Sequence, residues 1–118
     1  MLLSGPPEAF SCVAGTMLQE GFRTSAPIRK ACEASIMANA RAVEGDLAAA
    51  LAEAGMSVDQ APSLSRHIQT VIQGAFILAK SQEPCSAAGM ASEALAHLRR
   101  YFEMLLAVNA QGKPCSDE

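Results

Sequence analysis

The hydrophobic pattern of this chain is most continuous in residues 64–80, which read LSRHIQTVIQGAFILAK. From Val71 to Ala79 only Gln73 and Gly74 are not apolar. A helix that is apolar on every side has to be covered on every side. The stretch is too short for a membrane span, which takes about 20 apolar residues, and three other helices of a small domain can hardly enclose it. We therefore expect its second face to pack against another copy of the chain.

Helical spacing predicts two further helices before this stretch. The first covers about residues 8–20. The second runs from about residue 26 to residue 54, with Ser25 as a suitable N-cap and Gly55 as its terminator. Gly45, in its middle, costs about 1 kcal/mol relative to alanine, which leaves room for a local irregularity there. The apolar stripe of the second helix consists of Ile28, Cys32, Ile36, Val43, Leu47, Leu51 and Ala54.

The third and fourth predicted helices complete the chain. The third covers about residues 61–82, with Asp59 or Ser63 as its cap and Pro84 as its stop. The fourth begins after a cap at Ser86, runs to about residue 109, and carries two apolar seams. The first seam is Ala91, Leu95, Leu98, Phe102 and Leu105; the second is Met90, Ala94, His97, Tyr101, Met104 and Val108. The pattern alone does not decide which seam faces inward.

These elements predict an all-α fold. A four-helix domain of residues 7–109 would follow a disordered or truncated start (residues 1–6) and precede a flexible tail (residues 110–118). Because the last two helices each have two apolar faces, two from each of two chains would form an intermolecular four-helix bundle in a homodimer. The expected dimer interface consists of Gly74, Ala75, Leu78, His97, Tyr101, Met104 and Val108.

Composition and charge narrow the function. Half of the 118 residues are hydrophobic but only 4% are aromatic, so small and aliphatic side chains must fill the core. The net charge of −3, with no clustered basic face, argues against nucleic-acid binding by this chain alone. The start lacks the features of a signal peptide, so we expect a cytoplasmic protein with reduced thiols. The four cysteines lack metal-ligand spacing, and no metal or cofactor is expected.

The candidate chemistry is that of binding rather than catalysis. No nucleophile elbow or glycine-rich phosphate loop is present, so we do not expect an enzyme. We interpret His67 and His97 as structural or interface residues. Thr70 and Gln73 are polar residues on an otherwise apolar helix, and buried polar groups need hydrogen-bond partners. We expect these partners across the dimer, with a bound ligand as the alternative for Gln73. An apolar ligand cavity would use Phe10, Met17, Met37 and Phe76, although plain core packing is the alternative for each.

Several segments resemble, in the expected order, the C-terminal half of TetR-family transcriptional regulators. One segment resembles the helix that opens the regulatory core in that family, through Cys12, Gly15, Thr16, Gln19 and Glu20. The next helix resembles residues 26–29. The first dimerisation helix resembles residues 73–80, preceded by Arg66-His67, and the second resembles residues 97–101. The resemblance covers roughly residues 10–106.

This resemblance implies an effector-binding and dimerisation domain of a repressor. In the family, a small molecule would shift the helices under it and change the separation of two DNA-reading heads. The family's N-terminal helix-turn-helix domain does not fit into residues 1–9, so DNA would be bound only through that missing domain. The expected partners are a second copy and a small apolar effector, with no membrane. The alternative is an interaction protein that lacks the DNA-binding domain and heterodimerises with a full-length regulator.

Overall fold

The computed structural model describes the backbone of residues 12–111 and the side chains of residues 12–107. Within this range the chain is helical and contains no strand. Its elements are α1 (Val13–Gly21), α2 (Ala26–Glu53), the short 3-10 helix η2 (Val58–Gln60), α3 (Ala61–Lys80) and α4 (Pro84–Gln111). The predicted all-α, four-helix fold is confirmed.

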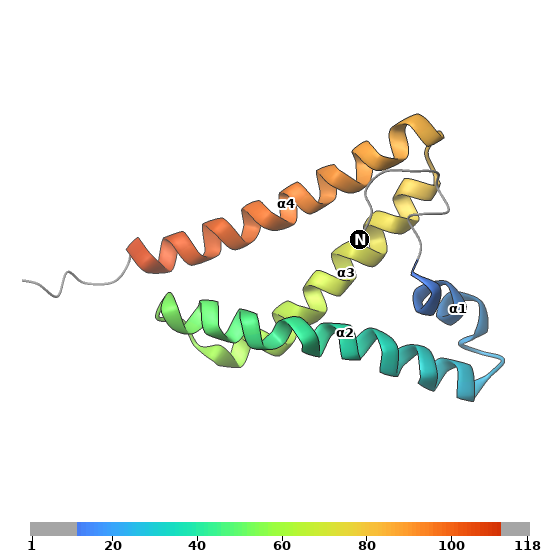
Figure 1. Ribbon diagram of the computed structural model, residues 1–118, viewed down its shortest axis with the longest axis horizontal. Coiled ribbons are helices and arrows are strands. Elements are labelled where there is room, and N and C mark those ends of the chain that lie inside the picture. The colour runs from blue at the N-terminus through green and yellow to red at the C-terminus, as the bar shows by residue number, and fades with distance from the viewer. Residues whose placement is uncertain (1–11, 112–118) are drawn as a thin grey trace, which may run out of the picture.

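The helices pack in chain order into an open, thin molecule. α1 packs on α2, α2 on α3, and α3 on α4; α2 and α4 diverge, with α3 running between them (Figure 1). The radius of gyration is 17.4 Å, whereas a compact domain of this length has about 13–14 Å. The shortest extent is 18 Å, which corresponds to two layers of helices about 10 Å thick. The chain is therefore a slab rather than a closed bundle.

The ends of α2 follow from residues that the sequence marks. Ser25 has extended backbone, and its Oγ accepts a hydrogen bond from the N–H of Ile28 at 3.3 Å. At the other end Gly55 takes a positive φ of 75°, and the N–H of Met56 reaches the carbonyl of Leu51 at 2.8 Å. α2 continues through Gly45, so the local irregularity for which this glycine leaves room does not interrupt the helix. The propensity cost of one exposed glycine is too small to interrupt a helix held on both sides by packing.

The predicted caps of α3 and α4 are also wrong. α3 starts at Ala61 without a side-chain cap: Asp59 lies within η2, and the Ser63 hydroxyl donates to the Gln60 carbonyl at 3.1 Å. Pro84 is the first residue of α4, so the helix begins two residues before the predicted cap at Ser86. Proline suits this position because its φ is helical and the missing N–H would have no partner in the first turn.

Two small clusters of buried side chains hold the helices together. Ala79, Ala87 and Ala91 are fully buried where α3 meets α4, and Phe76 packs against them. Leu51, Ala61 and Leu64 form the second cluster, with Phe102, Leu105 and Leu106 of α4 packed against it. The seam of α4 that begins with Ala91 therefore faces inward, and the seam containing Tyr101 and Met104 faces outward with 44% and 60% exposure.

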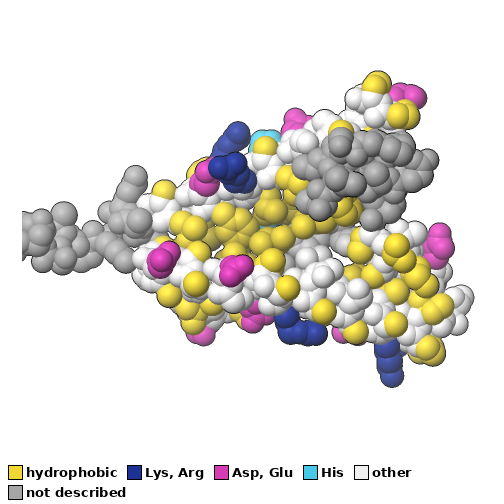
Figure 2. All heavy atoms as spheres, viewed as in Figure 1, with side chains coloured by type: hydrophobic (Ala, Val, Ile, Leu, Met, Phe, Trp, Pro, Cys, Tyr) yellow, Lys and Arg dark blue, Asp and Glu magenta, His cyan; other side chains and the backbone are white. Residues whose placement is uncertain are grey.

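The core reaches the molecular surface on one face. Figure 2 shows hydrophobic side chains gathered in a band between α2 and α4, with charged side chains on either side of it. Among the residues described, Leu51 and Ser65 are the largest side chains that are fully buried. Most other buried positions are alanine, so a single chain encloses little apolar volume.

Candidate functional site

The outward side of α3 and α4 forms one candidate interaction surface, the outer α3–α4 face. On α3, His67, Gly74 and Leu78 lie one to two turns apart on one side. On α4, His97, Tyr101 and Met104 have the same spacing. The rings of His67 and Tyr101 meet edge-on, 5.7 Å between centroids, so the two stripes lie next to each other. The face combines the apolar side chains of Leu78 and Met104 with the rings of His67, His97 and Tyr101.

The predicted interface residues occupy this face with two exceptions. Leu78, His97, Tyr101 and Met104 are exposed, and a Cβ added to Gly74 would meet nothing within 4 Å. Ala75 is only 4% exposed because it is packed within the chain. The side chain of Val108 lies outside the described residues.

A cleft between α1 and α2 is the second candidate site. Its volume is about 300 Å³, at the lower end of the range for small-molecule sites. It is lined by Val13, Ala14, Met17, Ile28, Ala31, Cys32 and Ser35. The lining carries no charge, and the hydroxyl of Ser35 and the thiol of Cys32 are its polar groups. Such a site suits a small, mainly apolar molecule.

Of the residues predicted to bind a ligand, only Met17 lies in this cleft. Phe76 packs against the alanine cluster of α3 and α4, and Met37 is half-buried elsewhere on α2. Gln73 lies on α3, beside α1. Phe10 lies outside the described residues.

The polar side chains of α3 find partners inside the chain. The Thr70 hydroxyl donates to the Arg66 carbonyl of its own helix at 3.0 Å. The Gln73 carboxamide lies against Gly15, where an added Cβ would be 3.1 Å from Cδ of Gln73, and it hydrogen-bonds the Cys12 thiol. These contacts remove the reason to expect bonds from Thr70 and Gln73 across a dimer.

Cys12 is a functional candidate that the sequence analysis missed. Its Sγ caps α1 by accepting a hydrogen bond from the N–H of Gly15 at 3.5 Å. Burial raises the pKa of the Cys12 thiol, but the hydrogen bond with Gln73, the backbone N–H groups of Gly15 and Ala14, and the charge of Lys80 together hold that pKa below its usual value of 9.0. The sequence signal was a cysteine immediately before the first helical residue, where a helix N-terminus favours the thiolate.

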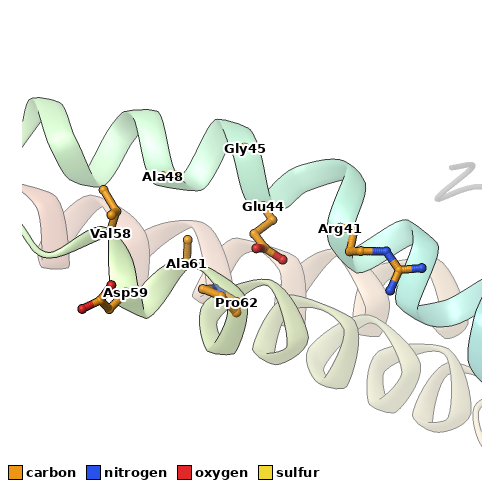
Figure 3. Close-up of a pocket in the computed structure, with 8 residues that line it drawn as sticks. All are labelled: Arg41, Glu44, Gly45, Ala48, Val58, Asp59, Ala61 and Pro62. Atoms are coloured by element: carbon orange, nitrogen blue, oxygen red, sulfur yellow. The ribbon is translucent and has the colours of Figure 1, made fainter.

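A third site, between α2 and the start of α3, also escaped the sequence analysis. This α2–α3 cleft has a volume of about 500 Å³ and is lined by Arg41, Glu44, Gly45, Ala48, Val58, Asp59, Ala61 and Pro62 (Figure 3). Its walls come from segments on either side of the turn after α2. The hydrophobic periodicity of the sequence does not predict a cleft between them.

Comparison with known families decides the general class of the protein. The family model for the C-terminal domain of LmrA/YxaF-like transcriptional regulators matches residues 7–94. The chain belongs to this family. The resemblance to TetR regulators is thereby confirmed. No significant match was found among curated proteins or among solved structures.

The LmrA/YxaF-like match spans α1, α2, α3 and the first part of α4, so it includes the α1–α2 cleft and the α3 residues of the outer α3–α4 face, but not His97, Tyr101 and Met104 of α4. C-terminal domains of TetR regulators usually dimerise and bind effectors, and they are generally not enzymes. In the described part of the LmrA/YxaF-like domain, no group of three or more His, Cys, Asp or Glu side chains is placed to hold a metal ion. None of the helices described has the length and apolarity needed to cross a membrane.

Proposed function

We propose that this LmrA/YxaF-like domain is the ligand-binding and dimerisation domain of a TetR-like transcriptional repressor that acts in the cytoplasm. The observation that carries the proposal is the outer α3–α4 face, where Leu78, Tyr101 and Met104 are 55%, 44% and 60% exposed. DNA would be bound by a helix-turn-helix domain of the intact regulator, and not by residues 12–111.

Burial of this face by a second copy is favoured by both its chemistry and the shape of the chain. Removing a Leu or Met side chain from water contributes about 1.5–3 kcal/mol, and a two-fold interface uses each residue twice. Gly74 has open space in front of it, which lets a partner helix approach closely. Because the slab encloses little apolar volume by itself, a four-helix bundle of α3 and α4 from two copies would cover the outer α3–α4 face and enlarge the core.

The effector in this proposal is a small apolar molecule in the α1–α2 cleft. α1 contacts α3 through the Gln73 carboxamide, and α3 carries the proposed dimer face. A ligand that wedges between α1 and α2 would favour conformations in which α1 moves relative to α3. The two sites would then be coupled through α3, and the ligand would shift the population of dimer arrangements.

Native mass spectrometry of the purified chain tests the dimer and retained ligand together. The wild type should be a dimer, while Leu78→Glu and Tyr101→Glu should be monomers because each places a charge in the centre of the apolar interface. Phe22→Glu is the matched control, since Phe22 is a 46% exposed apolar residue away from α3 and α4; it should remain a dimer. A wild-type monomer, or dimers in both variants, would refute the assignment of this face.

A further inference from the structure

The lining of the α2–α3 cleft differs in kind from that of the α1–α2 cleft. Its volume of about 500 Å³ is well within the range of small-molecule sites. Neither the family match nor the proposed function assigns a role to it. It is formed by helical segments packed around the cluster of Leu51, Ala61 and Leu64, so its walls are held by the core.

The floor of this cleft is apolar. Ala48, Val58, Ala61 and Pro62 supply hydrocarbon surface from both sides. Val58 is 47% exposed, although valine is usually buried, and Ala61 is 2% exposed. An apolar molecular body in the cleft would cover the Val58 side chain without moving the core.

The charge inside the cleft is negative. The half-buried carboxylate of Glu44 extends from α2 toward Pro62 (Figure 3), and among residues 12–107 it has no hydrogen bond or ion pair. Asp59 lines the other end of the cleft, and its exposed carboxylate points away from Glu44 (Figure 3). The guanidinium of Arg41 points along α2, away from Glu44 (Figure 3). The N-terminus of α3 adds only about half a positive charge.

We propose that the α2–α3 cleft binds a small organic cation, an amine whose ammonium group pairs with Glu44 and whose apolar body covers Ala48, Val58 and Pro62. A half-buried carboxylate gives up part of its hydration, and a charged partner compensates that loss better than a neutral one. The apolar floor selects an amine with a hydrocarbon body over a simple metal cation. This inference stands on the cleft alone and is independent of the dimer and the effector.

The test is an NMR titration of the full chain with hexylamine hydrochloride at constant ionic strength. The amide resonances of Gly45, Ala48, Asp59 and Ala61 should shift and saturate, while those of Val13 and the rest of the α1–α2 cleft should not. 1-Hexanol and sodium hexanoate are the neutral and anionic probes of the same length. Equal binding of the alcohol, or tighter binding of the anion, would overturn the proposal.

Two variants locate the binding site. Glu44→Gln should raise the Kd for hexylammonium about two- to fivefold, the effect expected for loss of a partly exposed ion pair. Glu33→Gln removes an exposed carboxylate of the same helix outside the cleft and should leave the Kd unchanged. Equal Kd values for the two variants would show that Glu44 does not bind the cation.

A third variant narrows the cleft without disturbing packing. A Cβ at Gly45 meets nothing within 4 Å, so Gly45→Leu fits the wall of the cleft and occupies part of its space. The circular dichroism melting curve should show a folded protein, and the saturable shifts of Asp59 and Ala61 should be lost. Unchanged hexylammonium binding by the folded variant would place the amine elsewhere.

Discussion

At the scale of the residue, the contact between Gly15 and Gln73 governs how α1 lies on α3. Gly15 is buried, and any side chain there would meet the Gln73 carboxamide. That carboxamide also hydrogen-bonds Cys12, which caps α1. Three residues thus connect the helix next to the apolar cleft with the helix that carries the outer face. Gly15 is required here for space, since its backbone lies in an ordinary α-helix.

Replacement of Gly15 should therefore change the pKa of the Cys12 thiol. In Gly15→Ala the Gln73 side chain has to swing away, and the loss of its hydrogen bond should raise the pKa of Cys12. Alkylation of Cys12 by iodoacetamide, followed by mass spectrometry as a function of pH, should require a higher pH than in the wild type. Gly45→Ala, where the added methyl group meets nothing, is the control and should leave the pH profile unchanged.

The sign of the linked stability follows from the lowered pKa. Because the native thiol has a pKa below the 9.0 of an unperturbed one, the thiolate stabilises the native state fully above pH 9.0. That contribution is lost as the pH falls through the native pKa. The free energy of unfolding of the wild type relative to Cys12→Ser should thus rise with pH in this window.

An identical alkylation profile for wild type and Gly15→Ala would show that Gln73 does not act on Cys12.

At the scale of the element, α2 is shared by two clefts of opposite character. Near its start it meets α1 in an uncharged cleft lined by residues such as Met17 and Ile28. Near its end it meets the start of α3 in a cleft with Glu44 and Asp59 on its walls. Of the buried residues of α2, Cys32 lines the first cleft, and Leu51 belongs to the cluster that contains Ala61 of the second. One long helix thereby contributes to both clefts, the uncharged one and the one lined by charged side chains.

Filling the α1–α2 cleft should abolish binding of a small apolar probe. Ala31→Phe introduces a ring at an exposed lining position of α2, and it should weaken the binding of 1-naphthol, followed by its fluorescence, by at least about tenfold because the ring and the probe compete for the same volume. Ala34→Phe adds the same ring on the same helix outside the cleft and should bind as the wild type does. If both variants bind 1-naphthol like the wild type, the effector site lies elsewhere.

At the scale of the whole molecule, the slab has too little interior for its length. Its radius of gyration of 17.4 Å exceeds the value of about 13–14 Å for a compact domain. Apolar surface remains on the outer α3–α4 face and in the band between α2 and α4 (Figure 2). Folding and assembly are therefore expected to be linked, as in dimers whose monomers have a small core.

This linkage predicts a melting temperature that depends on protein concentration. Thermal unfolding of the wild type, followed by circular dichroism, should shift to higher Tm as the concentration is raised a hundredfold, because only the native state forms the dimer. Leu78→Glu should melt at a lower Tm that does not depend on concentration. A concentration-independent Tm in the wild type would contradict the linkage of folding to dimerisation.

The helices and their class were predictable from local sequence. A period of 3.6 residues, the cap at Ser25 and the positive φ of Gly55 depend on neighbours within one or two turns, so the residues that determine them are close in the chain. The same holds for the family resemblance, which the match to residues 7–94 confirms. Local signals did not predict the first residues of α3 and α4. Asp59, Ser63 and Ser86 are all suitable N-caps, but the packing of each helix fixed a different first residue.

The sites depended on the tertiary structure. The sequence placed two apolar seams on α4, but only the packing of α4 on α3 decided that Ala91 faces inward and Tyr101 outward. It also identified Gln73 as a polar residue in need of a partner, while the crossing of α1 and α3 determined that the partner is Cys12. The physical reason is that periodicity fixes which residues share a helical face, whereas the direction of that face depends on side-chain contacts between segments far apart in the chain.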